Sequence, residues 1–341
     1  LLGLTYFDKK ITFAIVGASN IAEAHIINVQ KCLSAQIKYI FSEDIARAKR
    51  CSSRYYIKPT SNYNEILDDN DVDAVVITTE PQRHASLAIK AIQSGKHVLI
   101  EKPLDSDISM AKKVLEEANK SSLVTSVVSQ NRFDPKILEM KKQMKINLIG
   151  EPFLCEVRMF WSRSLDYYSS GNGWRGKIGN VLINQGIHLI DIVIWFFGYP
   201  KRIESSIYKV KDNIECYDNA ILTLQFEHNI WANMVFSTAC SDSEPYGFRI
   251  YGTKGTLVYD ADNIYSRKNQ GIQFKNKLRQ LFGNRFRLKV EKSLLQLQIE
   301  NFIDSIINKT TPAVSLKEAY DTLSVIKKCE KDSCYSFSDY S

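Results

Sequence analysis

One stretch of the chain decides its fold: Lys96-His97-Val98-Leu99-Ile100-Glu101-Lys102-Pro103-Leu104. Val98, Leu99 and Ile100 are apolar and come after Gly95, which predicts a buried strand. The stretch then changes to a carboxylate, an ammonium and a proline. In open α/β sheets, ligands bind beyond the carboxyl ends of strands. A lysine in a desolvated crevice can lose its proton near neutral pH, so Lys102 is a candidate base. The alternative is a charged surface loop.

Another strand candidate, Ile11–Val16, is followed directly by Gly17-Ala18-Ser19-Asn20-Ile21-Ala22. This run matches the phosphate-binding pattern G-x-G-x-x-G/A loosely, because Ser19 replaces the second glycine and Ala22 stands at the third. Gly17 permits a tight turn, and small residues let a pyrophosphate approach the N-terminus of the next helix. An ordinary strand–turn–helix is the alternative interpretation.

The first part of the chain alternates between strand and helix patterns. Further strands are predicted at residues 37–41, 73–79, 97–100 and 123–128, and helices at 44–55, 82–94 and 106–119. Such alternation is typical of a doubly wound parallel sheet. We therefore predict a Rossmann domain over residues 8–130.

Beyond residue 130 the pattern changes to strands that follow one another without helices between them. Strands are predicted at residues 153–161, 202–210, 220–226, 230–237, 246–251 and 256–259, and helices at 135–144, 181–197, 291–308 and 315–329. This order favours an α/β domain over residues 131–341 with an open, mostly antiparallel sheet, one face covered by helices. The basic run at residues 275–289 is expected to be a loop.

The composition bounds the protein's class. The 341 residues predict two domains, and 44% hydrophobic with 24% charged residues is typical of a globular protein. Scattered charges with a net +7 fit an anionic small ligand and argue against nucleic acid. No apolar run suits a membrane span, and residues 1–4 are too short for a signal peptide. Seven cysteines without a C-x-x-C pair suit reduced thiols in a cytoplasm.

The predicted helix at residues 181–197 carries a polar stripe on an apolar background. Asn184, His188 and Asp191 fall at i, i+4 and i+7, which places them on one helix face. A single histidine on such a helix is usually a core residue with satisfied hydrogen bonds. Three buried polar groups each need a partner, so the stripe is a candidate site.

Several segments together resemble the Gfo/Idh/MocA oxidoreductases, the glucose-fructose oxidoreductase and inositol dehydrogenase family. The stretch Gly95 to Leu104 resembles that family's E-K-P signature, and Thr79 with His84 matches its T-P-N-x-x-H segment. Trp174-Arg175-Gly176 and the run from Gly179 to Asp191 resemble its W-R-G and G-G-G-x-L-x-D/N-x-G-x-H-x-x-D segments. Residues 247–257 are similar to its late strand–turn–strand, so the resemblance covers most of the chain in the right order.

The resemblance implies that the enzyme transfers a hydride between nicotinamide and a ring hydroxyl or ketone of a sugar, cyclitol or sugar nucleotide. Lys102 would exchange the hydroxyl proton, and His188 would orient that oxygen or share the proton. Many relatives carry Asp where this chain has Asn184, so the third catalytic position here is an amide. Arg158, Arg163 and Arg175 make a sugar nucleotide a plausible substrate.

The resemblance also assigns binding residues, and no metal site is expected. Residues expected to bind NAD or NADP are Gly17, Ser19, Asn20, Ile21, Ser42, Thr79, His84, Glu101 and Lys102. Residues expected to bind substrate are Arg163, Trp174, Arg175, Asn184 and His188. Ser42, where NAD enzymes often carry an acid, favours NADP, whereas Glu43 would repel a 2′-phosphate and favours NAD. NAD is the preferred prediction.

Three further expectations concern the protein's role and assembly. A homo-oligomer, dimer or tetramer, is expected, with the open sheet as its interface. Two other functions are compatible with the same family: a non-catalytic dinucleotide-binding regulator, and an NAD-dependent glycosidase. Turnover of a polyol or sugar nucleotide would exclude the regulator, and release of a free sugar without net NADH would identify the glycosidase.

Overall fold

The computed structural model describes residues 10–170, 173–260, 263–268 and 292–332. These residues form two compact units. The first contains the described residues up to 130 together with 292–320, and the second contains those between 131 and 291 together with 321–332. The division near residue 130 lies where the sequence pattern changes, but residues 292–320 group with the first unit and not with the second. The predicted loop at residues 275–289 and Cys334 lie outside the described residues.

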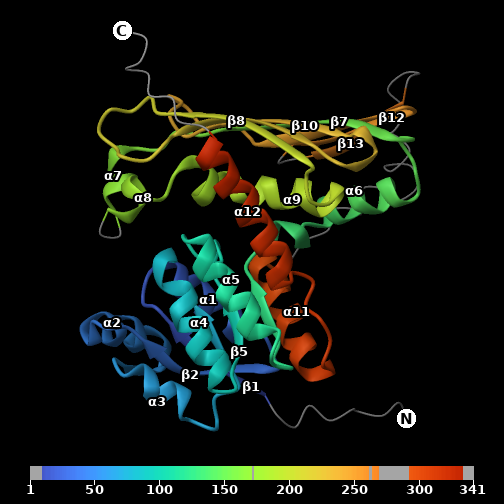
Figure 1. Ribbon diagram of the computed structural model, residues 1–341. Coiled ribbons are helices and arrows are strands. Elements are labelled where there is room, and N and C mark those ends of the chain that lie inside the picture. Colours follow the sequence, from blue (N-terminus) through green and yellow to red (C-terminus); the bar gives the residue numbers. More distant parts are fainter. Residues whose placement is uncertain (1–9, 171–172, 261–262, 269–291, 333–341) are drawn as a thin grey trace, which may run out of the picture. The chain divides into compact units, whose positions relative to one another are not determined.

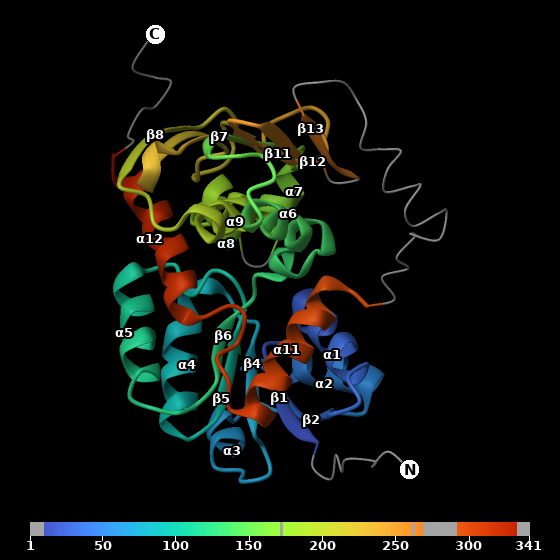
Figure 2. The same ribbon diagram turned by 90° about the vertical axis from the view of Figure 1, so that its right-hand side faces the viewer.

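The first unit is built on a six-stranded parallel sheet with the order β3-β2-β1-β4-β5-β6. Its strands are β1 (Ile11–Val16), β2 (Ala35–Phe41), β3 (Lys58–Thr60), β4 (Ala74–Ile77), β5 (His97–Ile100) and β6 (Thr125–Val127). Its helices are α1 (Asn20–Gln30), α2 (Ile45–Tyr55), α3 (Tyr63–Leu67), the short 3₁₀ helix η1 (Pro81–Arg83), α4 (His84–Gln93), α5 (Ile108–Ala118) and α11 (Leu294–Asn308). Figure 2 shows α4 and α5 on one face of this sheet and α1 with α11 on the other. The predicted doubly wound fold is confirmed.

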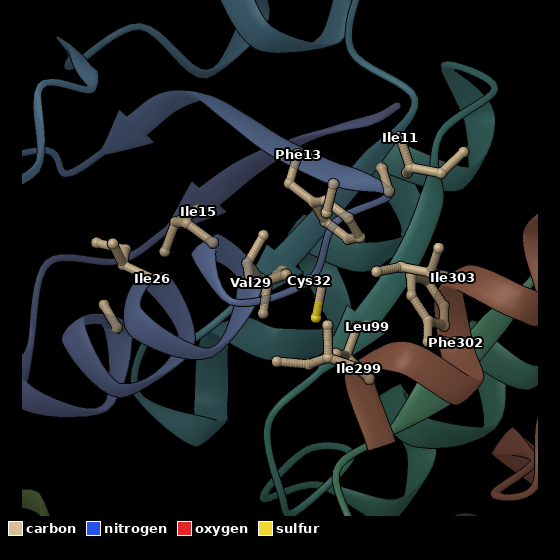
Figure 3. Packing of buried hydrophobic residues seen from close by; sticks show 14 of the residues in the cluster. Ile11, Phe13, Ile15, Ile26, Val29, Cys32, Leu99, Ile299, Phe302 and Ile303 are labelled. Carbon is tan, nitrogen blue, oxygen red and sulfur yellow. The ribbon is translucent and has the colours of Figure 1, made fainter. Parts of the chain in front are cut away.

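The core of the first unit explains why α11 belongs to it. Figure 3 shows side chains of β1, α1 and α11 meeting in one cluster, with Phe13 next to Phe302 and Ile303. The rings of Phe13 and Phe302 lie 6.3 Å apart between centroids. Phe302 and Ile303 are at most 2% exposed, so apolar burial attaches this late helix to the first sheet.

The second unit contains a seven-stranded mixed sheet with the order β13-β12-β11-β7-β10-β9-β8. Its strands are β7 (Pro152–Phe160), β8 (Arg202–Tyr208), β9 (Asn219–Gln225), β10 (Trp231–Ser237), β11 (Gly247–Gly252), β12 (Gly255–Asp260) and β13 (Asn263–Lys268). Its helices are α6 (Pro135–Lys145), α7 (Leu165–Ser169), α8 (Trp174–Lys177), α9 (Ile187–Phe197) and the later part of α12 (Leu316–Asp332). Short helical turns are η2 (Gln130–Phe133), η3 (Leu182–Gly186) and η4 (Glu227–Asn229).

The second sheet is mostly antiparallel, and β7 with β10 is a parallel pair. Figure 1 shows α6 and α9 along one face of the sheet, and no described helix covers the other face. Arg158, Val235 and Ile221 lie in register on three neighbouring strands, and Ile221 is 41% exposed. This exposed face is the one that the sequence analysis expected to be open.

Several elements differ from the sequence prediction, among them the short helices α7 and α8, which lie where no helix was predicted. The segment β3–α3 was not predicted, because a three-residue strand and a five-residue helix are too short to show a period. β13 was not predicted either. The expected continuous helix at residues 181–197 was wrong in its first turns: residues 182–186 form a π-helical turn before α9 begins. Gly186 packs in this turn with the Phe236 ring only 3.3 Å from the position of a Cβ.

The described cysteines, Cys32, Cys51, Cys155, Cys216, Cys240 and Cys329, are all free thiols. Burial raises the pKa of Cys32 to about 11 and that of Cys216 to about 12, which makes both thiols poor nucleophiles. Across the described ranges, every helix is too short or too polar to cross a bilayer.

Candidate active site

The turn after β1 accepts only glycine at its first position. Gly17 has φ +127°, and a Cβ there would lie 2.5 Å from Thr78 Oγ1 and 2.9 Å from the Thr78 carbonyl. The Gly17 N–H donates to the carbonyl of Phe41, which ties the turn to β2. The backbone therefore passes close to the end of β4 with no room for a side chain.

The N-terminus of α1 suits an anion. Ser19 occupies the N-cap, but its side chain makes no capping hydrogen bond. Ser19, Asn20 and Ile21 are exposed, whereas Gly17 is buried. First-turn N–H groups with a positive helix end are the usual site of a dinucleotide pyrophosphate. These residues fit the cofactor expected from the sequence.

The end of β2 holds an ion pair that the sequence analysis did not predict. Ser42 follows Phe41 and its N–H donates to the carbonyl of Thr60. The next residue, Glu43, forms an ion pair with Arg83 of η1. In dinucleotide-binding folds an acid at this place binds the ribose hydroxyls, and a nearby arginine accommodates a 2′-phosphate. This unit carries both groups.

The turn after β5 orders Glu101 and leaves Lys102 accessible. Glu101 Oε1 lies 2.8 Å from His25 Nε2, and its Oε2 accepts the Lys102 N–H at 3.0 Å. Burial raises the pKa of Glu101, but the hydrogen bond and charge of His25, together with Lys102, outweigh it and hold that pKa below its usual range. Glu101 and Pro103 are buried, whereas Lys102 between them is only half-buried. The Lys102–Pro103 peptide bond is cis.

His84 links two of the predicted loops. Its Nδ1 lies 2.8 Å from the carbonyl oxygen of Pro103, and its Nε2 lies 3.0 Å from that of Thr79. The ring is 1% exposed. Both nitrogens are thus engaged by backbone, which makes His84 a residue that positions the lysine turn. Sequence analysis had assigned His84 to cofactor binding.

The predicted cofactor residues meet at one edge of the first sheet. Gly17, Ser42, Thr79 and Glu101 follow β1, β2, β4 and β5, and these strands are parallel neighbours. The carboxyl ends of parallel neighbours lie along the same edge, and the strand order reverses at β1 and β4, where ligands bind in such sheets.

In the second unit, the side chain of Asn184 is hydrogen-bonded to a tyrosine. Asn184 Nδ2 donates to Tyr167 Oη at 2.7 Å, and Gln185 Nε2 donates to the same oxygen at 2.6 Å. Sequence analysis gave neither Tyr167 nor Gln185 a role. Asn184 and Gln185 both lie in the π-helical turn, which no periodicity in the sequence indicates.

The polar stripe divides into two groups. Asp191 is 2% exposed and accepts from Arg132, so it serves packing within the second unit. His188 is half-buried, whereas residues 181–187 and 189–194 are buried. The junction between η3 and α9 lies between Asn184 and His188, so the α-helical spacing expected for this pair does not apply there.

The other predicted substrate residues gather around Tyr167. The guanidinium carbons of Arg163 and Arg175 each lie 5.3 Å from the centre of its ring. Arg175 also stacks on Trp174 at 4.8 Å. Arg158, in contrast, projects from the exposed face of the second sheet. We call Arg163, Tyr167 and Arg175 the Tyr167 cluster.

Comparison with known proteins agrees with this arrangement. Residues 11–129 match the family model for the oxidoreductase family with an NAD-binding Rossmann fold, Gfo/Idh/MocA. Residues 141–333 match the C-terminal alpha/beta domain of the same family. The chain belongs to the Gfo/Idh/MocA oxidoreductases. It is accordingly an NAD(P)-dependent oxidoreductase, and the resemblance inferred from its motifs is confirmed.

Individual relatives are distant but cover nearly the whole chain. An uncharacterized oxidoreductase of Bacillus subtilis, YrbE, is 25% identical over 89% of each chain. The scyllo-inositol 2-dehydrogenase (NAD(+)) of the same bacterium is 23% identical over 93% of this chain and 92% of its own. The crystal structure of the WlbA dehydrogenase from Bordetella pertussis, in complex with NADH and UDP-GlcNAcA, matches with a TM-score of 0.86 at 22% identity, covering 95% and 96%. At this identity the structural match shows the fold alone.

Proposed function

We propose that this oxidoreductase transfers a hydride between a nicotinamide dinucleotide and a ring hydroxyl or ketone of a sugar, cyclitol or sugar nucleotide. The observation that supports it is the accessible Lys102 between two buried residues, at the same sheet edge as the Gly17 turn. A lysine in that setting suits proton exchange with an alcohol. Relatives that act on inositol, and a relative bound to a UDP-sugar, are consistent with these substrate classes.

In this proposal the first unit supplies binding and the proton acceptor. The Gly17 turn and the N-terminus of α1 hold the pyrophosphate of NAD or NADP, whose nicotinamide accepts or donates the hydride. Lys102 Nζ takes the hydroxyl proton during oxidation and returns it during reduction. Burial raises the pKa of Glu101, but His25 and Lys102 lower it below its usual range, so we assign Glu101 as a carboxylate and not as the proton donor. His84 keeps the lysine turn in place through its two backbone contacts.

The second unit is proposed to supply substrate contacts. His188 is accessible within a buried run, which suits contact with a substrate oxygen. Asn184 has its Nδ2 held by Tyr167, which restricts the orientation of the amide. An amide offers hydrogen bonds but no titratable charge, so Lys102 and His188 are the proton-exchanging groups of this proposal.

NAD is proposed as the preferred cofactor, since Glu43 stands where an acid can accept from ribose hydroxyls. We also propose that the exposed face of the second sheet pairs two or more copies of the chain. Ile221 and its in-register neighbour Val235 place apolar surface there. Light scattering coupled to size-exclusion chromatography would measure that assembly.

The test is a screen for NAD⁺ and NADP⁺ reduction over inositols, aldoses, sugar acids and UDP-sugars, read at 340 nm, with free sugar release measured in parallel. Reduction with at least one compound supports the proposal. Tight NADH binding without any turnover would favour a regulator, and release of free sugar without net NADH would favour a glycosidase.

A further inference from the structure

Two arginines in the second unit share one aromatic ring. Arg163 and Arg175 each place the guanidinium carbon 5.3 Å from the Tyr167 ring centre, and each stacks on a tryptophan as well, Trp161 and Trp174, at 4.8 Å. Such distances are those of cation–π contacts. Two like charges beside the same ring repel each other, so this arrangement favours a ligand that supplies negative charge.

The ring between the arginines is firmly held. Its hydroxyl accepts hydrogen bonds from Asn184 and Gln185, and its ring makes a T-shaped contact with Tyr168, with centroids 5.4 Å apart. Tyr168 is 4% exposed and its hydroxyl lies 2.7 Å from Thr238 Oγ1. The Tyr167 ring is therefore held in one orientation, and the guanidinium groups of Arg163 and Arg175 contact it at defined positions.

Among the described residues, neither arginine of the Tyr167 cluster has an acidic partner. In the described parts of the chain, Arg163 donates only to the Ser162 carbonyl, and Arg175 only to the carbonyl and hydroxyl oxygens of Ser170. Other arginines of the protein form ion pairs with carboxylates, as in Arg83–Glu43 and Arg54–Glu23. The cluster keeps two guanidinium groups half-buried and available for an anion.

We propose that Arg163 and Arg175 bind an anionic group of the substrate, which makes the substrate an anionic sugar, with a diphosphate or a carboxylate attached, and not a neutral polyol. Guanidinium groups recognise both kinds of oxyanion through paired N–H donors. The inference rests on the proposed function, because Asn184 links the cluster to the proposed substrate contacts. A purely structural stacking role for the two arginines is the competing explanation.

The probes are UDP and D-glucuronate, with D-glucose as the neutral control, titrated by calorimetry into the full-length protein. Saturating NADH is present throughout, so that the anion site at the Gly17 turn is occupied. We expect at least one anionic probe to bind and glucose to bind much more weakly. UDP binding without glucuronate binding would indicate a sugar nucleotide, and the reverse a sugar acid; both outcomes support the inference.

The variants Arg163→Gln and Arg175→Gln should each weaken anion binding by about tenfold or more, since each removes charge-assisted hydrogen bonds. Arg158→Gln removes the same charge from the exposed sheet face and should leave the affinity unchanged. Arg163→Lys and Arg175→Lys keep the charge but lose the paired donors, so they should bind with intermediate affinity even if a glutamine variant fails to fold.

Failure of both anions to bind the wild type would overturn the inference, as would equal affinities in the wild type and the cluster variants. Turnover of neutral polyols only would contradict the inference and leave the proposed function intact. Absence of turnover with every compound, with anion binding retained, would contradict the proposed function alone.

Discussion

Arg132 and Asp191 form a bidentate ion pair in the interior of the second unit. Arg132 Nε lies 2.8 Å from Asp191 Oδ2 and its second terminal nitrogen lies 2.7 Å from Oδ1, with side chains only 2% and 3% exposed. Trp195 lies 5.3 Å from the guanidinium. Asp191, which the sequence places in a candidate site, is therefore a structural residue.

Removing one partner of this pair should destabilise the protein. Asp191→Asn leaves a buried guanidinium without its counter-charge, and such changes typically cost about 3–5 kcal/mol in free energy of unfolding. Urea unfolding measures the loss. The double variant Arg132→Met/Asp191→Leu should recover most of it. Glu204→Gln, which alters the exposed pair with Arg202, should cost less than about 1 kcal/mol. Equal losses for Asp191→Asn and Glu204→Gln would contradict this assignment.

Gly17 should tolerate no side chain. Gly17→Ala places a methyl group against Thr78 and should abolish or strongly weaken NADH binding, and Gly17→Glu should abolish it by adding charge at the pyrophosphate site. Gly95→Ala is the matched control, because Gly95 also has a positive φ but its Cβ would meet no atom within 4 Å. Fluorescence titration with NADH measures both. Unchanged NADH affinity in both Gly17 variants would refute the assignment of this turn.

Lys102 should exchange the proton of the substrate hydroxyl. Lys102→Met should lower kcat by roughly 10²–10⁴-fold, the usual contribution of a general base, with NADH affinity nearly unchanged. The comparison uses whichever substrate the screen yields. Lys112→Met, on the exposed side of α5, is the control and should keep full activity. A Lys102 variant with most of its turnover would show that another group exchanges the proton.

The Glu43–Arg83 pair should set cofactor preference. Glu43→Ala removes the charge that repels a 2′-phosphate and leaves Arg83 to bind it, so affinity for NADPH relative to NADH should rise. Arg83→Ala should move the preference the other way. Each cofactor is titrated against each variant. An unchanged ratio in both variants would mean that the ribose binds elsewhere.

The amide at position 184 should influence the pH profile. Asn184→Asp introduces a carboxylate that stabilises neighbouring protonated groups and raises their pKa values. For alcohol oxidation the acceptor must be deprotonated, so the rising limb of kcat/KM should move to higher pH. The fold should persist, because Tyr167 can donate to the new carboxylate. Profiles of both proteins from about pH 5 to 10 bracket the ordinary histidine and lysine values. If the rising limb of kcat/KM stays in place or moves to lower pH, Asn184 does not influence the proton-exchanging groups.

Most of the first unit was predictable from local patterns. Strands next to Gly17 and before Lys102 show continuous apolar runs because both faces of a parallel sheet are buried, and glycine marks their turns. Residues that follow parallel neighbouring strands all lie at the carboxyl edge of the sheet. Parallel pairing alone therefore places Gly17, Ser42, Thr79 and Glu101 at that edge. The family motifs add the expectation of a nicotinamide cofactor.

Contacts between residues far apart in the chain could not be read from local patterns. The sequence indicates where the strands and turns of the first sheet lie, since their period and glycines are local. It did not show that α11 completes the first core through Phe302, that Arg132 neutralises Asp191, or that Arg83 pairs with Glu43. Nor did it show that Asn184 and Gln185, in the π-helical turn, donate hydrogen bonds to Tyr167. Each of these contacts is a long-range pairing of charge, shape or hydrogen bonds, and its energy exists only after the chain has brought the partners together.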